Sequence, residues 1–148
     1  MPDNKFRFGR LRMNLLKMKH ELPIILANQA QNYFVSSFTK QGWDGQSWQQ
    51  VNRRIPGTSE YKYPKLKGLS RRTSPILVRT GRLRRAVSNS IRSQTFQSVR
   101  MVVDLPYAAA QNYGDPDINL PQRQYMGNSP ILSGMHKLKI KNYVNISS

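Results

Sequence analysis

The longest periodic pattern of apolar residues runs from Leu15 to Phe38. Pro23 interrupts it, and proline is tolerated in the first turn of a helix but is costly in its interior. The pattern therefore favours a main helix from about Leu22 to Thr39, closed by Gly42, with room for a shorter helical piece before it. One long kinked helix is the alternative. The apolar positions lie three or four residues apart, which is helical spacing: Leu15, Met18, Leu22, Ile25, Leu26, Ala30, Tyr33, Phe34 and Phe38.

Residues 40–75 show little helical or alternating period and contain several prolines and glycines. A connection of this length is uncommon in a compact domain and is usually functional or mobile. Trp43 and Trp48 stand near its start, and we expect them to anchor the loop to the core. Base stacking on nucleic acid is the alternative, because arginines and tyrosines follow them: Arg53, Arg54, Tyr61 and Tyr63.

A short helix and a β-hairpin are predicted next. The apolar face of the helix comprises Leu77, Leu83 and Val87, with Thr80 as the N-cap and Gly81 allowing a close backbone approach. Apolar and polar residues then alternate from Val87 to Asp104, with a turn-like segment at 93–98. This alternation is typical of a hairpin.

The rest of the chain predicts a second short helix, a loop and an ambiguous tail. Residues 105–115 have Pro106 in the first turn of the helix and Gly114 at its end. Residues 115–130 predict a loop. In the tail, Leu138 and Ile140 alternate with lysines, which favours a strand, although the spacing of Ile131, Met135 and Leu138 also fits a helix.

These elements predict an α+β fold, with one long N-terminal helix and short helices packed on a small antiparallel sheet, and with long loops. The chain has 148 residues, enough for one domain with one core. We expect a flexible basic arm at 1–14 and a single α+β domain at 15–148. We expect neither a signal peptide nor a membrane span, because no apolar run is long enough.

Charge is the most unusual feature of the composition. Lys and Arg number 24 against 7 Asp and Glu, a net charge of +17, concentrated in 1–20 and 53–100. Such a field attracts phosphate backbones, acidic protein surfaces or anionic lipid, and the attraction weakens with salt. A solvated basic surface without a specific anion is the plainer interpretation. Five arginines are candidates for contact with an acidic partner or DNA: Arg79, Arg82, Arg84, Arg85 and Arg92.

The sequence offers no convincing catalytic or metal-binding pattern. His20 and His136 lie far apart without nearby acids, and no pair of residues has metal-ligand spacing. Asp115 and Asp117 flank a proline, where Asp commonly serves turn geometry. Because there is also no cysteine, a thiol nucleophile and a disulfide framework are excluded. We expect no catalytic residues, no metal and no cofactor, and so no enzyme.

Four segments, 38–51, 76–87, 106–114 and 120–129, resemble in this order the phage virion-morphogenesis family, also called tail-completion proteins. That family shows a Trp after a Gly-rich turn, then TG-x-L, YA-x-x-x-N-x-G and P-x-R-x-aromatic-hydrophobic-G. This chain has Gln111 where many relatives have His, and its basic charge is not typical of the family. The matching positions are Trp48, Thr80, Gly81, Leu83, Tyr107, Ala108, Asn112, Gly114, Pro121, Arg123, Tyr125, Met126 and Gly127.

The resemblance implies a structural virion component at the head–tail junction, present in the host cytoplasm during assembly. Such proteins help to finish the tail so that it can join a DNA-filled capsid. The implied partners are identical subunits in a ring, other phage neck and tail proteins and, non-specifically, packaged DNA, with no membrane. A basic nucleic-acid-binding module, architectural or ribosome-associated, is the alternative, motivated by the charge. Sequence-specific readout is not expected, because no recognition-helix motif is present.

The residues that carry the resemblance have a plain structural interpretation as well. Gly114 and Gly127 can adopt positive φ, Tyr107 and Tyr125 can bury their rings, and Arg123 can hold carbonyl groups through its fork of donors. The functional interpretation is that the 120–127 loop and the 40–75 loop lie at subunit contacts, since each subunit of a closed ring presents two different surfaces.

Overall fold

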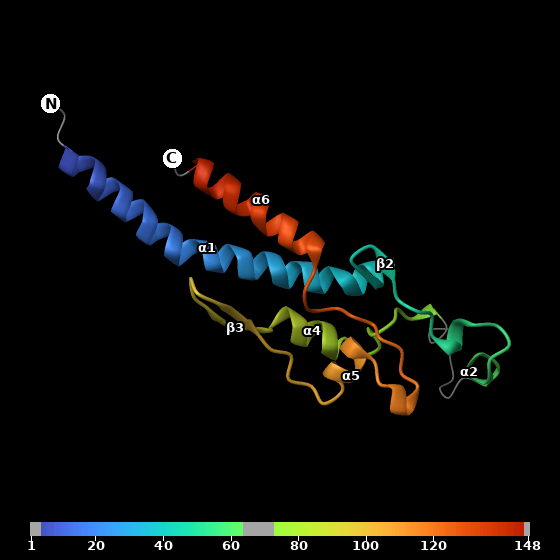
Figure 1. Cartoon of the computed structure of the whole chain (residues 1–148). Helices are drawn as coiled ribbons and strands as arrows, with labels where there is room; N and C mark the ends of the chain where they lie inside the picture. The colour runs from blue at the N-terminus through green and yellow to red at the C-terminus, as the bar shows by residue number, and fades with distance from the viewer. Residues whose placement is uncertain (1–3, 64–72, 147–148) are drawn as a thin grey trace.

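The computed structural model describes residues 4–63 and 73–146. It confirms the α+β class: helices predominate, and two antiparallel sheets of two strands each accompany them (Figure 1). The elements are α1 (Asn4–Lys40), β1 (Gly42–Trp43), β2 (Gln46–Ser47), η1 (Asn52–Arg54), α2 (Ser59–Lys62), α4 (Arg82–Ser88), β3 (Ile91–Gln94), β4 (Val99–Met101), α5 (Ala108–Tyr113), η2 (Pro116–Ile118) and α6 (Pro130–Ile146).

Helix α1 is a single helix with Pro23 inside it, so the alternative of one long helix is the one that the structure adopts. The expected start near Leu22 is wrong. The expected flexible arm at 1–14 is, from Asn4 onward, the first turns of this helix. The apolar residues Leu11 and Phe8 continue the helical spacing on the N-terminal side of Leu15, so the sequence pattern of a helix extends toward the N-terminus. Figure 1 shows the axis of α1 changing direction part way along, as a proline inside a helix commonly causes.

The C-terminal tail is helix α6, so the preference for a strand was wrong. It runs alongside α1 (Figure 1). Leu132 is buried, and the Tyr143 hydroxyl donates to Glu21 of α1 at 2.7 Å. Leu132, His136 and Tyr143 share the helix face toward α1, whereas the alternating residues 137–141 are all exposed. A short alternation among exposed residues therefore carried no information about strand pairing.

The central hairpin is confirmed with shifted bounds. Strand β3 pairs antiparallel with β4, with Ile91 opposite Met101, and the register shifts between Ile91 and Ser93. Val87, where the helical pattern and the alternation overlapped, is fully buried on helix α4, as the helical pattern predicted. Leu77, which was placed on the same face, instead lies before the helix with φ +62°. The N-cap prediction is also corrected. Gly81 holds that position with φ +68°, and the Thr80 hydroxyl accepts the Arg82 N–H at 3.4 Å from one residue earlier.

The core forms where the second half of α1 meets α4, α5, α6 and the loops. Trp48 is buried as predicted, with its ring 5.9 Å from Phe38, and Tyr125 lies 5.4 Å from the same ring on another side. After α1, the positive φ falls on Gln41 rather than on the expected Gly42. Gly42 serves a close approach instead, because a Cβ there would collide with the backbone of Gln46. The buried cluster comprises Ala30, Phe34, Phe38, Trp48, Ile76, Leu83, Val87, Ala108, Tyr125 and Leu132.

Candidate assembly surfaces

Asn112 of α5 ties together two of the four motif segments. Its side-chain oxygen accepts the backbone N–H groups of Tyr125 and Met126 at 2.9 and 3.1 Å, and its amide donates to the Met126 carbonyl at 3.0 Å. Asn112 is buried, so these bonds replace water for three backbone groups. A single side chain thus fixes the path of the 120–127 loop against α5.

Three further side chains extend this framework. The Tyr125 hydroxyl donates to the Ala108 carbonyl at 2.8 Å, and burial raises the pKa of Tyr125 to about 12, so the group stays a neutral donor. Trp48 Nε1 donates to the Gln124 carbonyl at 2.7 Å, and Arg123 Nε donates to the Gln49 carbonyl at 3.2 Å. The first, third and fourth motifs therefore meet in one hydrogen-bonded unit, which we call the motif framework.

The remaining motif residues divide between this unit and its edges. Gly114 and Gly127 have φ of +79° and +136°, as predicted, and a Cβ on Gly114 would lie 2.9 Å from the Gln122 nitrogen. Leu83 is buried on α4 and Pro121 is partly buried. Tyr107 departs from prediction: it lies at the N-cap of α5 and is 39% exposed, whereas Ala108 and Asn112 are the buried residues of this helix. Thr80 is exposed.

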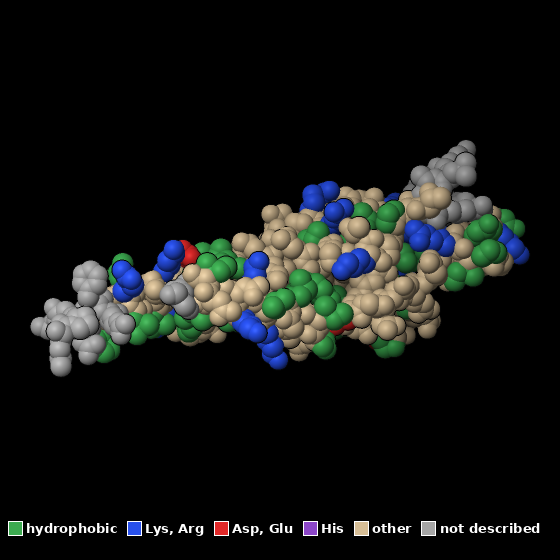
Figure 2. Space-filling model, turned by 90° about the horizontal axis from the view of Figure 1, so that it is seen from above, with side chains coloured by type: hydrophobic (Ala, Val, Ile, Leu, Met, Phe, Trp, Pro, Cys, Tyr) green, Lys and Arg blue, Asp and Glu red, His purple; other side chains and the backbone are tan. Residues whose placement is uncertain are grey.

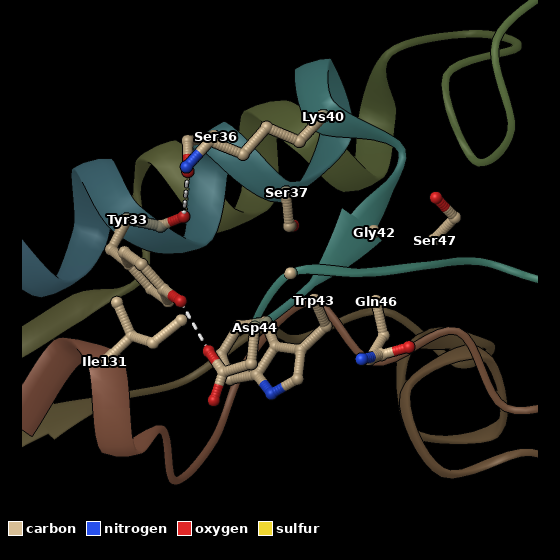
Figure 3. Close-up of a pocket in the computed structure, with 11 residues that line it drawn as sticks. Tyr33, Ser36, Ser37, Lys40, Gly42, Trp43, Asp44, Gln46, Ser47 and Ile131 are labelled. Carbon is tan, nitrogen blue, oxygen red and sulfur yellow. Dashed lines mark hydrogen bonds between the residues drawn. The ribbon is translucent and has the colours of Figure 1, made fainter.

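A second polar cluster, which the sequence did not reveal, joins α1, the β1–β2 turn and α6 (Figure 3). The Tyr33 hydroxyl donates to Asp44, and Ser129 Oγ donates to the same carboxylate at 2.6 Å. Burial, and then the bond to Asp44, raises the pKa of Tyr33. Ser129 Oγ also accepts the Leu132 N–H at 2.9 Å, which caps α6. A Ser directly before Pro130 was the available signal for this helix start.

The pocket beside this cluster has a volume of about 280 Å³, and Lys40 and Ile131 also line it (Figure 3). The Tyr33, Asp44 and Ser129 side chains bond to one another, and Ser129 also bonds to the backbone of α6, so the cluster holds three elements together. Within the described ranges, no group of three or more His, Cys, Asp or Glu could hold a metal ion. His136 lies between α6 and α1, and burial lowers its pKa.

An apolar groove of about 520 Å³ lies between the first half of α1, the β3–β4 turn and the end of α6. From this groove an apolar strip continues along the face of α1 toward the N-terminus, through Leu15, Leu11 and Phe8, which are 46%, 65% and 66% exposed. Contiguous exposed apolar surface of this kind marks interaction sites. The apolar groove is lined by Met18, Leu22, Pro23, Leu26, Phe96, Val99, Ile140 and Val144, among others.

Five arginines within α4 and on either side of it are exposed, as predicted, and we call them the basic face: Arg79, Arg82, Arg84, Arg85 and Arg92. Arg85 and Arg92 each donate to a nearby backbone carbonyl, at 3.1 and 2.8 Å. Among the residues that the structure describes, no carboxylate forms an ion pair with these five. Figure 2 shows Lys and Arg side chains along the length of the visible face and few acidic ones. Their contact with DNA or an acidic partner stays a prediction.

The chain matches no family model, no curated protein and no solved structure. Among residues 4–63 and 73–146, no helix combines the length and apolarity that a bilayer crossing requires.

Proposed function

We propose that this chain is a structural virion protein of a tailed phage, a tail-completion or head–tail joining component of the neck. In this proposal it assembles as a ring of identical subunits in the host cytoplasm and connects the tail to the DNA-filled capsid. Its partners are other copies of the chain and the neighbouring neck and tail proteins.

The observation that carries the proposal is the motif framework. Segments that resemble the family in sequence order lie far apart along the chain, yet Asn112, Tyr125, Trp48 and Arg123 join three of them by direct hydrogen bonds. The residues of the resemblance thus serve one fold-defining purpose, and such shared corners are what a family of scaffolds would have in common.

The chain also carries two apolar features of different kinds. The side chains of Phe8, Leu11 and Leu15 form an exposed strip on α1, whereas the apolar groove is a hollow of about 520 Å³. In a closed ring, one surface of each subunit meets a different surface of the next. We therefore assign the strip and the apolar groove to the contact between adjacent copies.

Light scattering of the purified chain, alone and mixed with neck proteins from the same genome, tests this function. We expect a defined oligomer that grows on addition of the neck proteins, and we expect the chain in purified virions by mass spectrometry. A strict monomer that is absent from virions would overturn the proposal.

A nucleic-acid-binding module is the second candidate, because the basic face has no ion-pairing carboxylate in the described part of the chain. Its test is the salt dependence of affinity for duplex DNA. Neutralising several phosphates gives a steep fall of affinity with salt, and binding should stay tight near about 0.15 M. Attraction that vanishes at that concentration would leave only the general effect of charge.

A further inference from the structure

A pocket of about 840 Å³ lies between the two loops that we expected at subunit contacts. One wall comes from residues 49–53 and from α2, and the opposite wall comes from residues 119–123. Both walls lie at the end of the molecule opposite the N-terminus (Figure 1). The polar side chains that line the pocket include Gln49, Asn52, Arg53, Glu60, Asn119 and Arg123.

Arg123 is the unusual member of this wall. Its side chain is only 6% exposed, which is rare for a charged residue. Its Nε donates to the Gln49 carbonyl, but Nη1 and Nη2 donate to no group in the described part of the chain. In the described part of the chain, the fully buried side-chain atoms that lack a hydrogen-bond partner belong to Gln29, Gln111 and His136. Because Nη1 and Nη2 of Arg123 are not among them, both nitrogens are accessible to solvent. The two terminal nitrogens therefore have donors to offer to the pocket.

A second guanidinium group adds to the positive electrostatic potential in the pocket. Arg53 lines the same pocket and donates to the Ser74 carbonyl at 3.1 Å. Burial lowers the pKa of Arg123, and repulsion from Arg53 lowers it further, so the two positive groups interact across the pocket. A buried guanidinium beside a like charge is costly unless an anion compensates it.

We propose that this pocket is a binding site for a carboxylate group, presented by an acidic segment of another protein chain. Nη1 and Nη2 of Arg123 bind the two carboxylate oxygens, and Arg53 adds a second positive charge, which offsets that of Glu60 in the same pocket. The choice of an assembling protein as the source rests on the proposed function, whereas the anion site itself does not.

Charge and access favour a carboxylate over a phosphate. Arg53, Arg123 and Glu60 together contribute one net positive charge to the pocket, which matches a singly charged carboxylate rather than a doubly charged phosphate monoester. A phosphodiester also carries a single charge, but nucleosides flank it on both sides. A guanidinium that is only 6% exposed is reached more easily by a carboxylate at the tip of a side chain.

The test is calorimetric titration of the full chain with an acetylated, amidated peptide of alternating Glu and Gly, at about 0.15 M salt to suppress general attraction. The matching Gln–Gly peptide, inorganic phosphate and a single-stranded oligonucleotide serve as comparison ligands. We expect the Glu peptide to bind and the Gln peptide not to bind.

Variants then assign the binding to the pocket. Arg53→Gln should weaken the affinity for the Glu peptide about tenfold, since it removes a charge-assisted contact, and Arg123→Lys should also weaken it, because Lys lacks the planar fork. Glu60→Gln should tighten binding, since it removes a like charge from the pocket. Lys137→Gln is the matched control: it lowers the net charge as Arg53→Gln does, but lies exposed on α6, and should change affinity less than about twofold. Circular dichroism checks each fold.

Equal affinity in the wild type and Arg53→Gln, or an equal loss in Lys137→Gln, would overturn the site. Binding of the oligonucleotide but not of the Glu peptide, with dependence on Arg53, would replace the carboxylate by a phosphodiester and so overturn the assigned source. If Arg123→Lys fails to fold, the opposite changes in affinity expected for Arg53→Gln and Glu60→Gln still test whether the peptide binds in this pocket. If the chain assembles into a ring but does not bind the peptide, the proposed carboxylate site is wrong and the proposed function stands. If the chain stays a monomer but binds the peptide, the proposed assembly function is wrong and the site stands.

Discussion

The two halves of α1 have the same apolar spacing but different surroundings. In the second half, Ala30, Phe34 and Phe38 are at most 7% exposed beneath the loops and α4. In the first half, Phe8, Leu11 and Leu15 continue the stripe with nothing of the described chain packed over their exposed surfaces. A periodic stripe therefore reports which face of a helix is able to bury apolar surface, and the cover has to come from elsewhere.

The largest loss of stability is expected from a substitution in the buried half of α1. Phe38→Ala removes a ring that contacts Trp48 and Tyr125, so the free energy of unfolding should fall by about 3–5 kcal/mol. Urea unfolding followed by circular dichroism measures this change. Leu11→Ala is the matched control in the exposed half and should stay within about 0.5 kcal/mol of the wild type when both are unfolded as monomers. Similar losses in both variants would mean that the first half is covered within the monomer itself.

A smaller loss is expected from the framework that covers the second half. Asn112→Ala leaves the buried N–H of Tyr125 without its acceptor and releases the 120–127 loop, at a cost of about 2–3 kcal/mol. The same unfolding measurement applies. Gln122→Ala, which removes one bond from an exposed side chain, should cost less than about 1 kcal/mol. An Asn112→Ala variant as stable as the wild type would contradict the role of the framework.

Substitutions in the exposed half of α1 should change subunit association rather than the stability of the monomer. Leu11→Ser should weaken subunit association about tenfold, because it removes one buried leucine from the contact, while unfolding of the monomer changes by less than about 1 kcal/mol. Sedimentation velocity over a concentration series provides the measurement. Met13→Ser is matched to it: Met13 is 68% exposed but lies off the strip. Equal effects of the two substitutions would remove the strip from the interface.

The smallest effect concerns His136, at the boundary between the two halves. Burial lowers its pKa, and a backbone hydrogen bond with Leu26 only partly opposes this. The unfolded chain, whose histidine titrates near about 6.5, therefore binds this proton more tightly than the fold. The stabilisation is complete above that pH and falls as pH drops toward the lowered pKa. Thermal unfolding across this window should show the slope, and His136→Gln should flatten it.

The sequence was most informative where local geometry is demanding. Gly114 and Gly127 were predicted to adopt positive φ and do so, and Trp48 was predicted to anchor its loop and is buried. The conformation of the glycines follows from backbone sterics, and the burial of Trp48 follows from its large apolar ring. Both effects can be predicted without knowing the rest of the fold.

The failures share a different cause. The tail was assigned to a strand because alternating residues at 137–141 outweighed both the helical spacing and the Ser–Pro signal for a helix start, and the burial of Leu132 in the core favours the helix. The cluster of Tyr33, Asp44 and Ser129 joins positions whose proximity no local pattern encodes. The pairing of Arg53 with Arg123 across one pocket has the same origin, since it exists only after two distant loops have come together.

Helix α1 has 37 residues and is therefore about 55 Å long. Pro23 removes one hydrogen bond from its interior, which makes this point the softest joint along the rod. The segment before the joint spans roughly 28 Å, so a change of about 20° in its direction swings the tip through roughly 10 Å. A change of direction at this single residue would thus displace the end of α1, and the apolar residues that it carries, by about the width of a helix.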